Sequence, residues 1–350
     1  MKPVEPVGIA AAALWLPESR ATVSDAVADG RLRTRQAKDL GHPDVPSAQA
    51  ETAPGLAVSA AREALRAAGA EAKDLDLCVH AWMYYQGHDL WSPPHYVAQE
   101  LGAHQAMPVG IQQVCNGGAA AVELTVARMT ADASHSDGGY RWGMVTTGDR
   151  FTEPGFDRWA SDYGVVYGDA GTAVLLRTPA APTDVLTLRS IVTMAAPELE
   201  SMHRGADPFA AAARTHRPRV DMRATKRVYL HEHGHEQFVR ANERAIRTIV
   251  AEALHDAGME PRDPRLRHAV LPRFGLKTLQ EFWLPILADC VSAEPLDYGR
   301  ATGHLGAGDA AAGLADLVRS RALRPGEAAL VFSAGAGFTW SCLVVQAPDC

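Results

Sequence analysis

The sequence is most informative at residues 114–120, which read Val114-Cys115-Asn116-Gly117-Gly118-Ala119-Ala120. A strand-like run at 109–114 comes before this stretch, and a helical pattern rich in alanine and valine, 117–129, follows it. The thiol of Cys115 is therefore expected beside a helix N-terminus, where free backbone N–H groups and the helix dipole favour a thiolate. The glycines allow a substrate to approach the backbone closely. The pattern indicates a nucleophilic cysteine, although a buried, inert thiol is also compatible with such a turn.

Strand-like and helical segments alternate on both sides of that turn. Apolar residues at helical spacing predict helices at 56–68, 93–101, 237–257 and 310–320. Strands are expected at 7–16, 75–81, 142–148, 170–176, 269–271, 328–332 and 341–346. A Pro/Ala-rich hinge at 178–186 separates two such series, which predicts an α/β protein of two units, 1–178 and 179–350. Residues 195–230 look irregular, and a loop of this length is often a lid or a binding loop.

Composition excludes several other classes of protein. The chain has 350 residues, a net charge of −7 and 47% hydrophobic residues, which does not favour nucleic acid as a partner. Its five cysteines form no CxxC pair, so reduced thiols are expected, without a disulfide framework or a zinc site. The longest N-terminal apolar run, 7–16, is too short to span a bilayer, and a cytoplasmic location is expected. Two basic runs, 31–35 and 214–227, are either solvated surface or a landing patch for an acidic carrier protein or a nucleotide phosphate.

Three further glycine-rich motifs follow Cys115 in the chain. They lie at residues 168–173 (GDAGTA), 299–314 (GRATGHLGAGDAAAGL) and 333–340 (SAGAGFTW). In this order and spacing, the four segments resemble the β-ketoacyl carrier-protein synthase III family of the thiolase superfamily. The resemblance implies a duplicated, five-layered αβαβα fold, a homodimer, and an acyl-carrier-protein or CoA thioester as the acyl donor, with no other cofactor. It also implies that Cys115 accepts the acyl group and that the backbone N–H groups of Cys115 and Ala336 form an oxyanion hole.

The sequence departs from that family at two positions. Where condensing members carry a His after a strand, this chain has Arg273 or Phe274, and where they carry an Asn it has His304. The pair that would bind a malonyl thioester carbonyl during decarboxylation is therefore absent, and a guanidinium cannot act as a neutral proton shuttle. Decarboxylative carbon–carbon bond formation is not expected.

What remains is a thiol with one imidazole. His304 could deprotonate an acceptor, and Asp309, five residues later, could orient the imidazole, although an acidic residue in the first turn of a helix is also favoured by the helix dipole. A Cys with a Gly-His-x-Gly-x-x-Asp motif resembles the ketosynthase III-like acyltransferases of natural-product pathways, which transfer malonyl groups in cervimycin assembly and 6-methylsalicylyl groups in chlorothricin and pactamycin assembly.

The sequence therefore predicts acyl transfer through Cys115 to an oxygen, nitrogen or sulfur atom of a small-molecule acceptor or a carrier. The alternatives are a condensing ketosynthase III with an altered proton relay and a non-catalytic paralogue that binds carrier proteins. An intact cysteine turn together with a newly placed histidine argues against the second alternative.

Aromatic side chains are candidates for the substrate pocket, since flat apolar surfaces suit an aromatic acyl group. The candidates are Trp82, Tyr84, Tyr85 and Trp91, together with Arg273 and Phe274, and Trp159, Tyr163 and Tyr167 could contribute likewise. Core packing is the competing interpretation of the run at 82–85. The histidines of His231-Glu232-His233-Gly234-His235 are interpreted as a solvated helix entrance, and no metal site is predicted.

Overall fold

The computed structural model describes residues 1–3, 5–132 and 141–349. Within them, ten strands form one sheet in the order β10-β9-β11-β12-β8-β1-β7-β6-β4-β5. Their bounds are β1 (Val7–Trp15), β4 (Leu77–Ala81), β5 (Met107–Ile111), β6 (Trp142–Asp149), β7 (Ala170–Arg177), β8 (Leu186–Ala195), β9 (Leu266–Val270), β10 (Glu294–Leu296), β11 (Ala328–Gly335) and β12 (Thr339–Gln346). The order consists of two equivalent halves, β1-β7-β6-β4-β5 and β8-β12-β11-β9-β10.

The two halves have the same strand directions. In each half the two outermost pairings are parallel and the two inner ones are antiparallel. They join where β1 runs antiparallel to β8 over the pairs Val7–Leu188, Gly8–Thr187 and Ile9–Leu186. The predicted boundary at 178/179 falls in the connection between β7 and β8.

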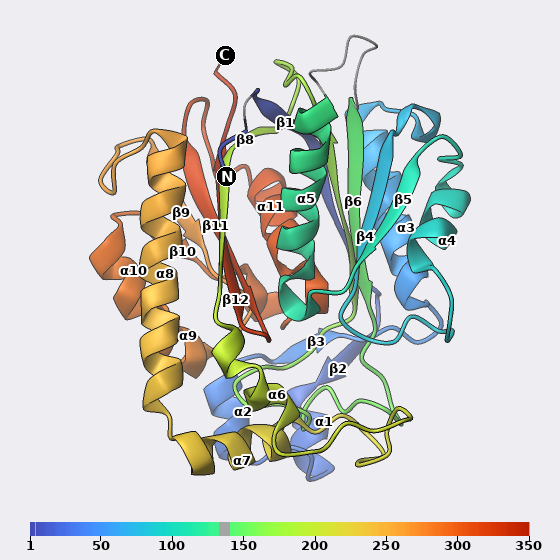
Figure 1. Cartoon of the computed structure of the whole chain (residues 1–350), viewed down its shortest axis with the longest axis vertical. Coiled ribbons are helices and arrows are strands. Elements are labelled where there is room, and N and C mark those ends of the chain that lie inside the picture. The colour runs from blue at the N-terminus through green and yellow to red at the C-terminus, as the bar shows by residue number, and fades with distance from the viewer. Residues whose placement is uncertain (4, 133–140, 350) are drawn as a thin grey trace.

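Helices cover both faces of both halves (Figure 1). The outer helices are α3 (Ala53–Ala68) and α4 (Pro93–Leu101) on the first half, and α8 (Glu236–Ala257), α9 (Leu276–Phe282) and α10 (Leu284–Cys290) on the second. The central helices are α5 (Gly117–Asp132) and α11 (Asp309–Ser320). Short 3₁₀ helices are η1 (Ala72–Asp74), η2 (Val114–Asn116), η3 (Pro197–Leu199), η4 (Tyr298–Ala301) and η5 (Gly306–Gly308).

Alternating side chains of the strands explain this layering. In β7, Ala173 and Leu175 pack with α3, whereas Val174 and Leu176 pack with the central helices. The strands of the second half alternate in the same way between the central helices and α8. Strands buried on both faces are mostly apolar, as β7, β11 and β12 are. The predicted five-layered αβαβα thiolase fold is confirmed.

A smaller group of elements lies at one end of the sandwich, where α5 and α11 begin (Figure 1). It contains β2 (Arg20–Thr22), β3 (Asp44–Pro46), α1 (Val23–Ala28), α2 (Thr34–Leu40), α6 (Ser201–Arg204) and α7 (Met222–His233). Leu40 and Val45 of this group pack against Trp159 and Val166. None of the helices in the described part of the chain is long and apolar enough to cross a membrane.

The prediction that residues 195–230 are irregular is wrong in part, because α6 and most of α7 lie there. Helix α7 begins at Asp221, whose side chain accepts a hydrogen bond from the backbone N–H of Ala224, and it buries Thr225 and Tyr229. A capping aspartate of this kind stabilises a helix N-terminus. The many basic residues of this segment obscure its amphipathic pattern in the sequence.

Candidate active site

Two glycine-rich turns meet at the centre of the molecule. The turn η2 opens α5, and the turn η5 opens α11. A Cβ atom at Gly118 would lie 2.4 Å from the carbonyl oxygen of Ala307, and one at Gly117 would lie 3.1 Å from the Ala307 Cβ. The glycines are therefore needed because the two turns pack backbone against backbone.

Cys115 lies in the first turn, with 9% of its surface exposed. The preceding Val114 has a φ of +47°, a left-handed conformation that β-branched residues rarely adopt. The thiol Sγ lies 3.5 Å from the sulfur of Met83, and the side-chain amide of Asn116 donates to Ser341 Oγ at 2.8 Å. The cysteine is thus held by a strained backbone and by a polar anchor on the next residue.

The end of β11 lies against this turn. A Cβ atom at Gly335 would come within 2.6 Å of the Asn116 nitrogen and 3.0 Å of the Cys115 Cβ. Glycine at this position lets the strand end approach the cysteine, and the next residue, Ala336, lines the same cavity as Cys115. The two residues predicted to form an oxyanion hole therefore lie on adjoining segments.

The other described cysteines differ from Cys115. They are free thiols at Cys78, Cys290 and Cys342. Burial raises the pKa of Cys78 to about 12 and raises that of Cys342 further, so both remain thiols at neutral pH. They are structural, as expected for buried thiols, and Cys350 lies outside the described residues.

His304 and Asp309 form a buried pair in the second turn. The imidazole Nδ1 lies 2.7 Å from Asp309 Oδ2, and the two side chains are 1% and 2% exposed. The carboxylate also accepts hydrogen bonds from the backbone N–H groups of Leu305, at 2.9 Å, and Arg273, at 3.1 Å. Asp309 therefore fixes the orientation of the imidazole and leaves Nε2 without a hydrogen-bond partner among the described residues.

The backbone of His304 is fixed as well. Its N–H donates to the carbonyl of Val166 at 2.8 Å, and its carbonyl accepts from the N–H of Gly168 at 2.9 Å. The preceding Gly303 has a φ of +67°, and a Cβ atom there would lie 2.7 Å from the Val166 carbonyl oxygen. Local sequence thus places the histidine through a glycine that no other residue could replace without strain.

Electrostatics favour a protonated His304. Burial alone lowers the pKa of the imidazole, but the negative charges of the Asp309 carboxylate and of the ionised Cys115 sulfur outweigh it and hold that pKa well above its usual range. For Asp309, burial raises the pKa, but His304 and Arg273 outweigh it and the net pKa is lowered. The imidazole of His304 can therefore accept a proton, and the Asp309 carboxylate stabilises the imidazolium that results.

Asp149 links the second turn to the segment before β5. Its carboxylate accepts from the backbone N–H groups of Met83 at 2.9 Å, Tyr84 at 2.8 Å and Ala307 at 2.9 Å. Burial raises its pKa to about 7, against the lowering effect of these hydrogen bonds. These bonds bring Met83, rather than its aromatic neighbours, next to Cys115.

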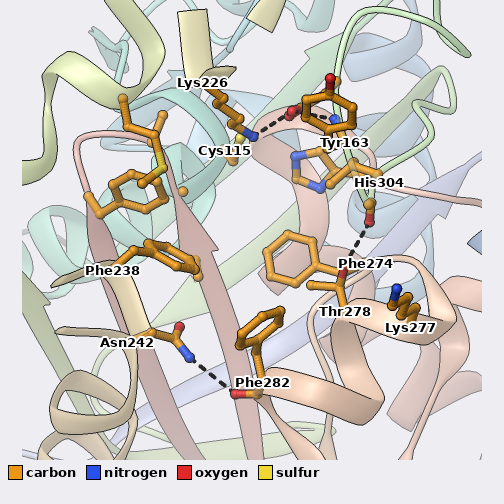
Figure 2. Close-up of a pocket in the computed structure, with 18 of the residues that line it drawn as sticks. Cys115, Tyr163, Lys226, Phe238, Asn242, Phe274, Lys277, Thr278, Phe282 and His304 are labelled. Carbon is orange, nitrogen blue, oxygen red and sulfur yellow. Dashed lines mark hydrogen bonds and ion pairs between the residues drawn. The ribbon is translucent and has the colours of Figure 1, made fainter. Parts of the chain in front are cut away.

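A cavity of about 380 Å³ contains both Cys115 and His304 (Figure 2). Its wall is largely aromatic and includes Tyr163, Tyr167, Phe238, Phe274, Phe282, Trp283, Phe338 and Trp340. The rings of Tyr167 and Phe274 lie 5.2 Å and 5.9 Å from that of His304. Polar side chains of the lining include Asp162, His203, Arg223 and Lys226, and Asp39, Lys277 and Glu281 line the cavity as well.

The predicted pocket residues have mixed outcomes. Phe274, Tyr163 and Tyr167 line the cavity, whereas Trp159 belongs to the core beneath the small group of elements. Arg273 does not line it, so that prediction is wrong.

The guanidinium of Arg273 points away from the cavity. It forms a buried ion pair with Asp316 and donates to Thr302 Oγ1 at 2.5 Å. Its buried charge needs these partners, so the side chain is structural, and only its backbone N–H reaches Asp309.

The aromatic run before β5 also lies outside this cavity, contrary to prediction. Trp82 stacks on His80 at 5.8 Å, and Tyr84 packs against Phe151 and Phe156. Tyr85 and Trp91 are 52% and 37% exposed. The bonds from Asp149 to this segment direct these rings away from Cys115.

The sequence did not identify the part of the wall formed by α6 and α7. Arg223 and Lys226 lie in the basic run 214–227, which was expected to be either solvated surface or a landing patch for an acidic carrier protein or a nucleotide phosphate, and not cavity wall; His203 lies in the stretch expected to be irregular. Residues 231–235 were predicted to form a solvated entrance to a helix. Helix α8 does begin directly after His235, but His231 and His233 belong to the end of α7, and His235 lines the cavity. No group of metal-ligating side chains occurs in the ranges that the structure describes.

Comparison with known proteins agrees with this architecture. The model of the 3-oxoacyl-[acyl-carrier-protein] synthase III C-terminal family matches residues 292–347. The solved structure of ChlB3, described as an acyltransferase, is 28% identical, with a TM-score of 0.86 over 98% of each chain. No curated protein matches the sequence.

More distant structures share the fold. The 3-oxoacyl-[acyl-carrier-protein] synthase III of Aquifex aeolicus VF5 is 19% identical, with a TM-score of 0.75 over 97% of this chain and 99% of that one. The priming β-ketosynthase of the R1128 polyketide pathway is 20% identical, with a TM-score of 0.76 over 100% of this chain and 98% of that one.

The chain has the fold of the thiolase superfamily, and over its full length it is similar to ChlB3. It is similar to 3-oxoacyl-[acyl-carrier-protein] synthase III and related natural-product enzymes, a likeness that supports condensing or acyl-transfer activity.

Proposed function

We propose that this protein transfers an acyl group from a carrier-protein or CoA thioester, through Cys115, to an oxygen, nitrogen or sulfur atom of a small-molecule acceptor. The observation that carries the proposal is the 2.7 Å bond between His304 and Asp309, which leaves Nε2 unpartnered in the cavity that holds Cys115. The description of ChlB3 as an acyltransferase and the polyketide setting of the R1128 neighbour are consistent with this role in a natural-product pathway.

In the first half-reaction, the Cys115 sulfur attacks the carbonyl carbon of the donor thioester. The new C–S bond forms as the carbonyl becomes an oxyanion, which the backbone N–H groups of Cys115 and Ala336 would stabilise. The oxyanion then collapses, the bond to the donor sulfur breaks, and the donor leaves as a thiol after taking the proton that His304 accepted from Cys115.

In the second half-reaction, the acceptor attacks the acyl-cysteine. His304 Nε2 removes the acceptor's proton as the new bond forms, and the Asp309 carboxylate stabilises the imidazolium. The Cys115–acyl bond then breaks, and the sulfur recovers the proton from His304. Atoms and charges balance without a cofactor.

The position of Arg273 favours transfer over condensation. A condensing enzyme needs two neutral groups at the malonyl carbonyl, but here one candidate residue is Arg273, whose guanidinium is held by Asp316 and Thr302. The other candidate, Phe274, has no polar atom in its side chain. A single imidazole remains beside Cys115, which suits proton transfer to and from an acceptor.

The aromatic wall favours an aromatic acyl group. Rings such as Phe238, Phe274 and Phe282 offer flat apolar faces, and an aromatic substrate packs well between such surfaces.

A malonyl thioester separates the proposal from a condensing activity. We expect intact-mass spectrometry to show either no reaction or addition of the whole malonyl group to Cys115, with no release of carbon dioxide. Formation of a β-ketoacyl product as fast as acylation would instead establish condensation, and a protein that no thioester in a broad panel acylates would support a non-catalytic carrier-binding role.

A further inference from the structure

One wall of the cavity is polar, and its buried carboxylate already accepts three hydrogen bonds. The carboxylate of Asp162 accepts from the Tyr163 N–H at 2.7 Å, from Lys226 Nζ at 2.5 Å and from the Tyr167 hydroxyl at 3.1 Å. Figure 2 shows the Lys226 and Tyr163 contacts. Three of its roughly four acceptor sites are occupied and its charge is paired with Lys226, so Asp162 has little left to offer a donor on a ligand.

Donors on the same wall are in surplus. The guanidinium of Arg223 donates through Nε to the Asp162 carbonyl at 2.6 Å and through Nη2 to the Trp159 carbonyl at 2.7 Å. A guanidinium has five N–H donors and an ammonium has three, so Arg223 and Lys226 keep several free. Burial lowers the pKa of His203 to about 3, so its ring is neutral; its buried Nδ1 has no hydrogen-bond partner among the described residues and can donate to a ligand in the tautomer that carries the proton there.

The charge on this wall is also unbalanced. Lys226 is paired with Asp162, whereas Arg223 has no ion pair among those found in the described residues; burial lowers the pKa of its guanidinium, and the nearby carboxylates of Asp157, Asp162 and Asp221 offset that effect only in part. Arg223 is half-buried on the first turn of α7, and its cation is only partly solvated. Such a group gains most from a ligand that brings a negative charge.

We propose that Arg223, Lys226 and His203 form an oxyanion-binding wall that pairs with a carboxylate or phosphate of the substrate while the aromatic wall holds its apolar part. The proposal rests on the proposed function, because it assigns part of the substrate of that reaction. The oxyanion has two possible sources: the phosphate of a phosphopantetheine donor, or a carboxylate on the acyl group or the acceptor.

Direct binding measurements separate these sources without requiring turnover. Isothermal titration calorimetry on the full-length Cys115→Ala variant would compare two matched pairs of probes. Benzoate against benzamide tests for a carboxylate, and phosphopantetheine against pantetheine tests for a phosphate. Benzoate and benzamide have nearly the same shape but differ in charge, and pantetheine differs from phosphopantetheine only in lacking the terminal phosphate.

We expect the anionic member of at least one pair to bind about tenfold or more tightly than its neutral partner, as charge-assisted hydrogen bonds provide. Arg223→Gln should remove most of that preference. Arg227→Gln, one turn further along α7 on an exposed position, should keep it. The pair that shows the preference identifies the source of the oxyanion.

Equal binding of the charged and neutral probes in both pairs would overturn the proposal, as would an equal loss of preference in Arg223→Gln and Arg227→Gln. If Arg223→Gln fails to fold, Arg223→Lys replaces it; the lysine keeps the charge but loses the planar fork, so the preference should fall about threefold, and an unchanged preference would contradict the assignment. Because Cys115 is absent from all these proteins, failure of acyl transfer and failure of anion binding are separate results.

Discussion

The turn at Cys115 and the turn at His304 occupy equivalent places in the two halves of the fold. Each follows the outermost strand of its half, β5 or β10, and each opens a central helix through a 3₁₀ turn. The first helix begins with Gly117, which has no side chain and packs against the second turn, whereas the second begins with Asp309, whose carboxylate binds the imidazole of His304. One turn presents a thiol to the cavity, and the other presents an imidazole that a carboxylate holds in place.

This difference shows how the two halves of a duplicated fold can supply different catalytic groups, a nucleophile from one half and a proton carrier from the other. The backbone contact between Gly118 and Ala307 brings the two turns together. Once they are in contact, side chains at equivalent helix starts can specialise, one as nucleophile and the other as proton carrier. The following experiments test that division from its largest expected effect to its smallest.

Cys115→Ala should abolish acylation, because the acyl group is attached to this sulfur. Intact-mass spectrometry after mixing with an acyl thioester should show no mass gain. Cys78→Ala, which changes a thiol buried beneath α3, should acylate like the wild type. Labelling of any other cysteine would refute the assignment of the nucleophile.

His304→Ala should affect the second half-reaction more than the first. A neutral acceptor needs its proton removed during attack, a contribution of about 10²–10⁴-fold. The acylated enzyme should therefore accumulate and discharge slowly, which single-turnover loss of the acyl mass would measure. Discharge at the wild-type rate would mean that the base lies elsewhere.

Asp309→Asn should slow discharge less, by roughly 10–100-fold, because the imidazole stays in place but loses its charged partner. His304 acts as a base only when neutral, so wild-type discharge should rise with pH through its raised pKa. Without the carboxylate, burial lowers that pKa, and the acidic limb of the pH profile should move to lower pH. An unchanged profile would indicate that Asp309 only stabilises the helix start.

The edge strands of the two halves, β5 and β10, differ in how readily each could pair with a strand of another molecule. β5 exposes Met107 and Val109, whereas β10 has three residues and carries Glu294 and Pro295, which protect an edge from pairing. We expect a homodimer through β5, so Val109→Lys should halve the mass measured by light scattering. Glu294→Lys, at the other edge, should leave the mass unchanged. A monomeric wild type at micromolar concentration would contradict this assembly.

The turns could be predicted from the sequence because their requirements are local. The glycines at 303 and 306 and the aspartate at 309 lie within a few residues of His304, and Cys115 directly precedes the helix that begins at Gly117. The cavity wall could not be predicted in this way. Arg223 reaches it only because α7 folds back onto Asp162, and the aromatic run at 82–85 misses it because Asp149, more than sixty residues away, binds the backbone of that run.

The pairing of β1 has a consequence for folding during synthesis. β1 lies in the middle of the sheet, yet its neighbours β7 and β8 come much later in the chain, with Trp15 opposite Gly171. About 150 residues separate these partners, and a ribosome adds roughly 5–20 residues per second. The alanine-rich strand β1 is therefore synthesised on the order of 8–30 s before β7 and β8. During that time its apolar residues would have to be covered by a chaperone or by a helix of the nascent chain.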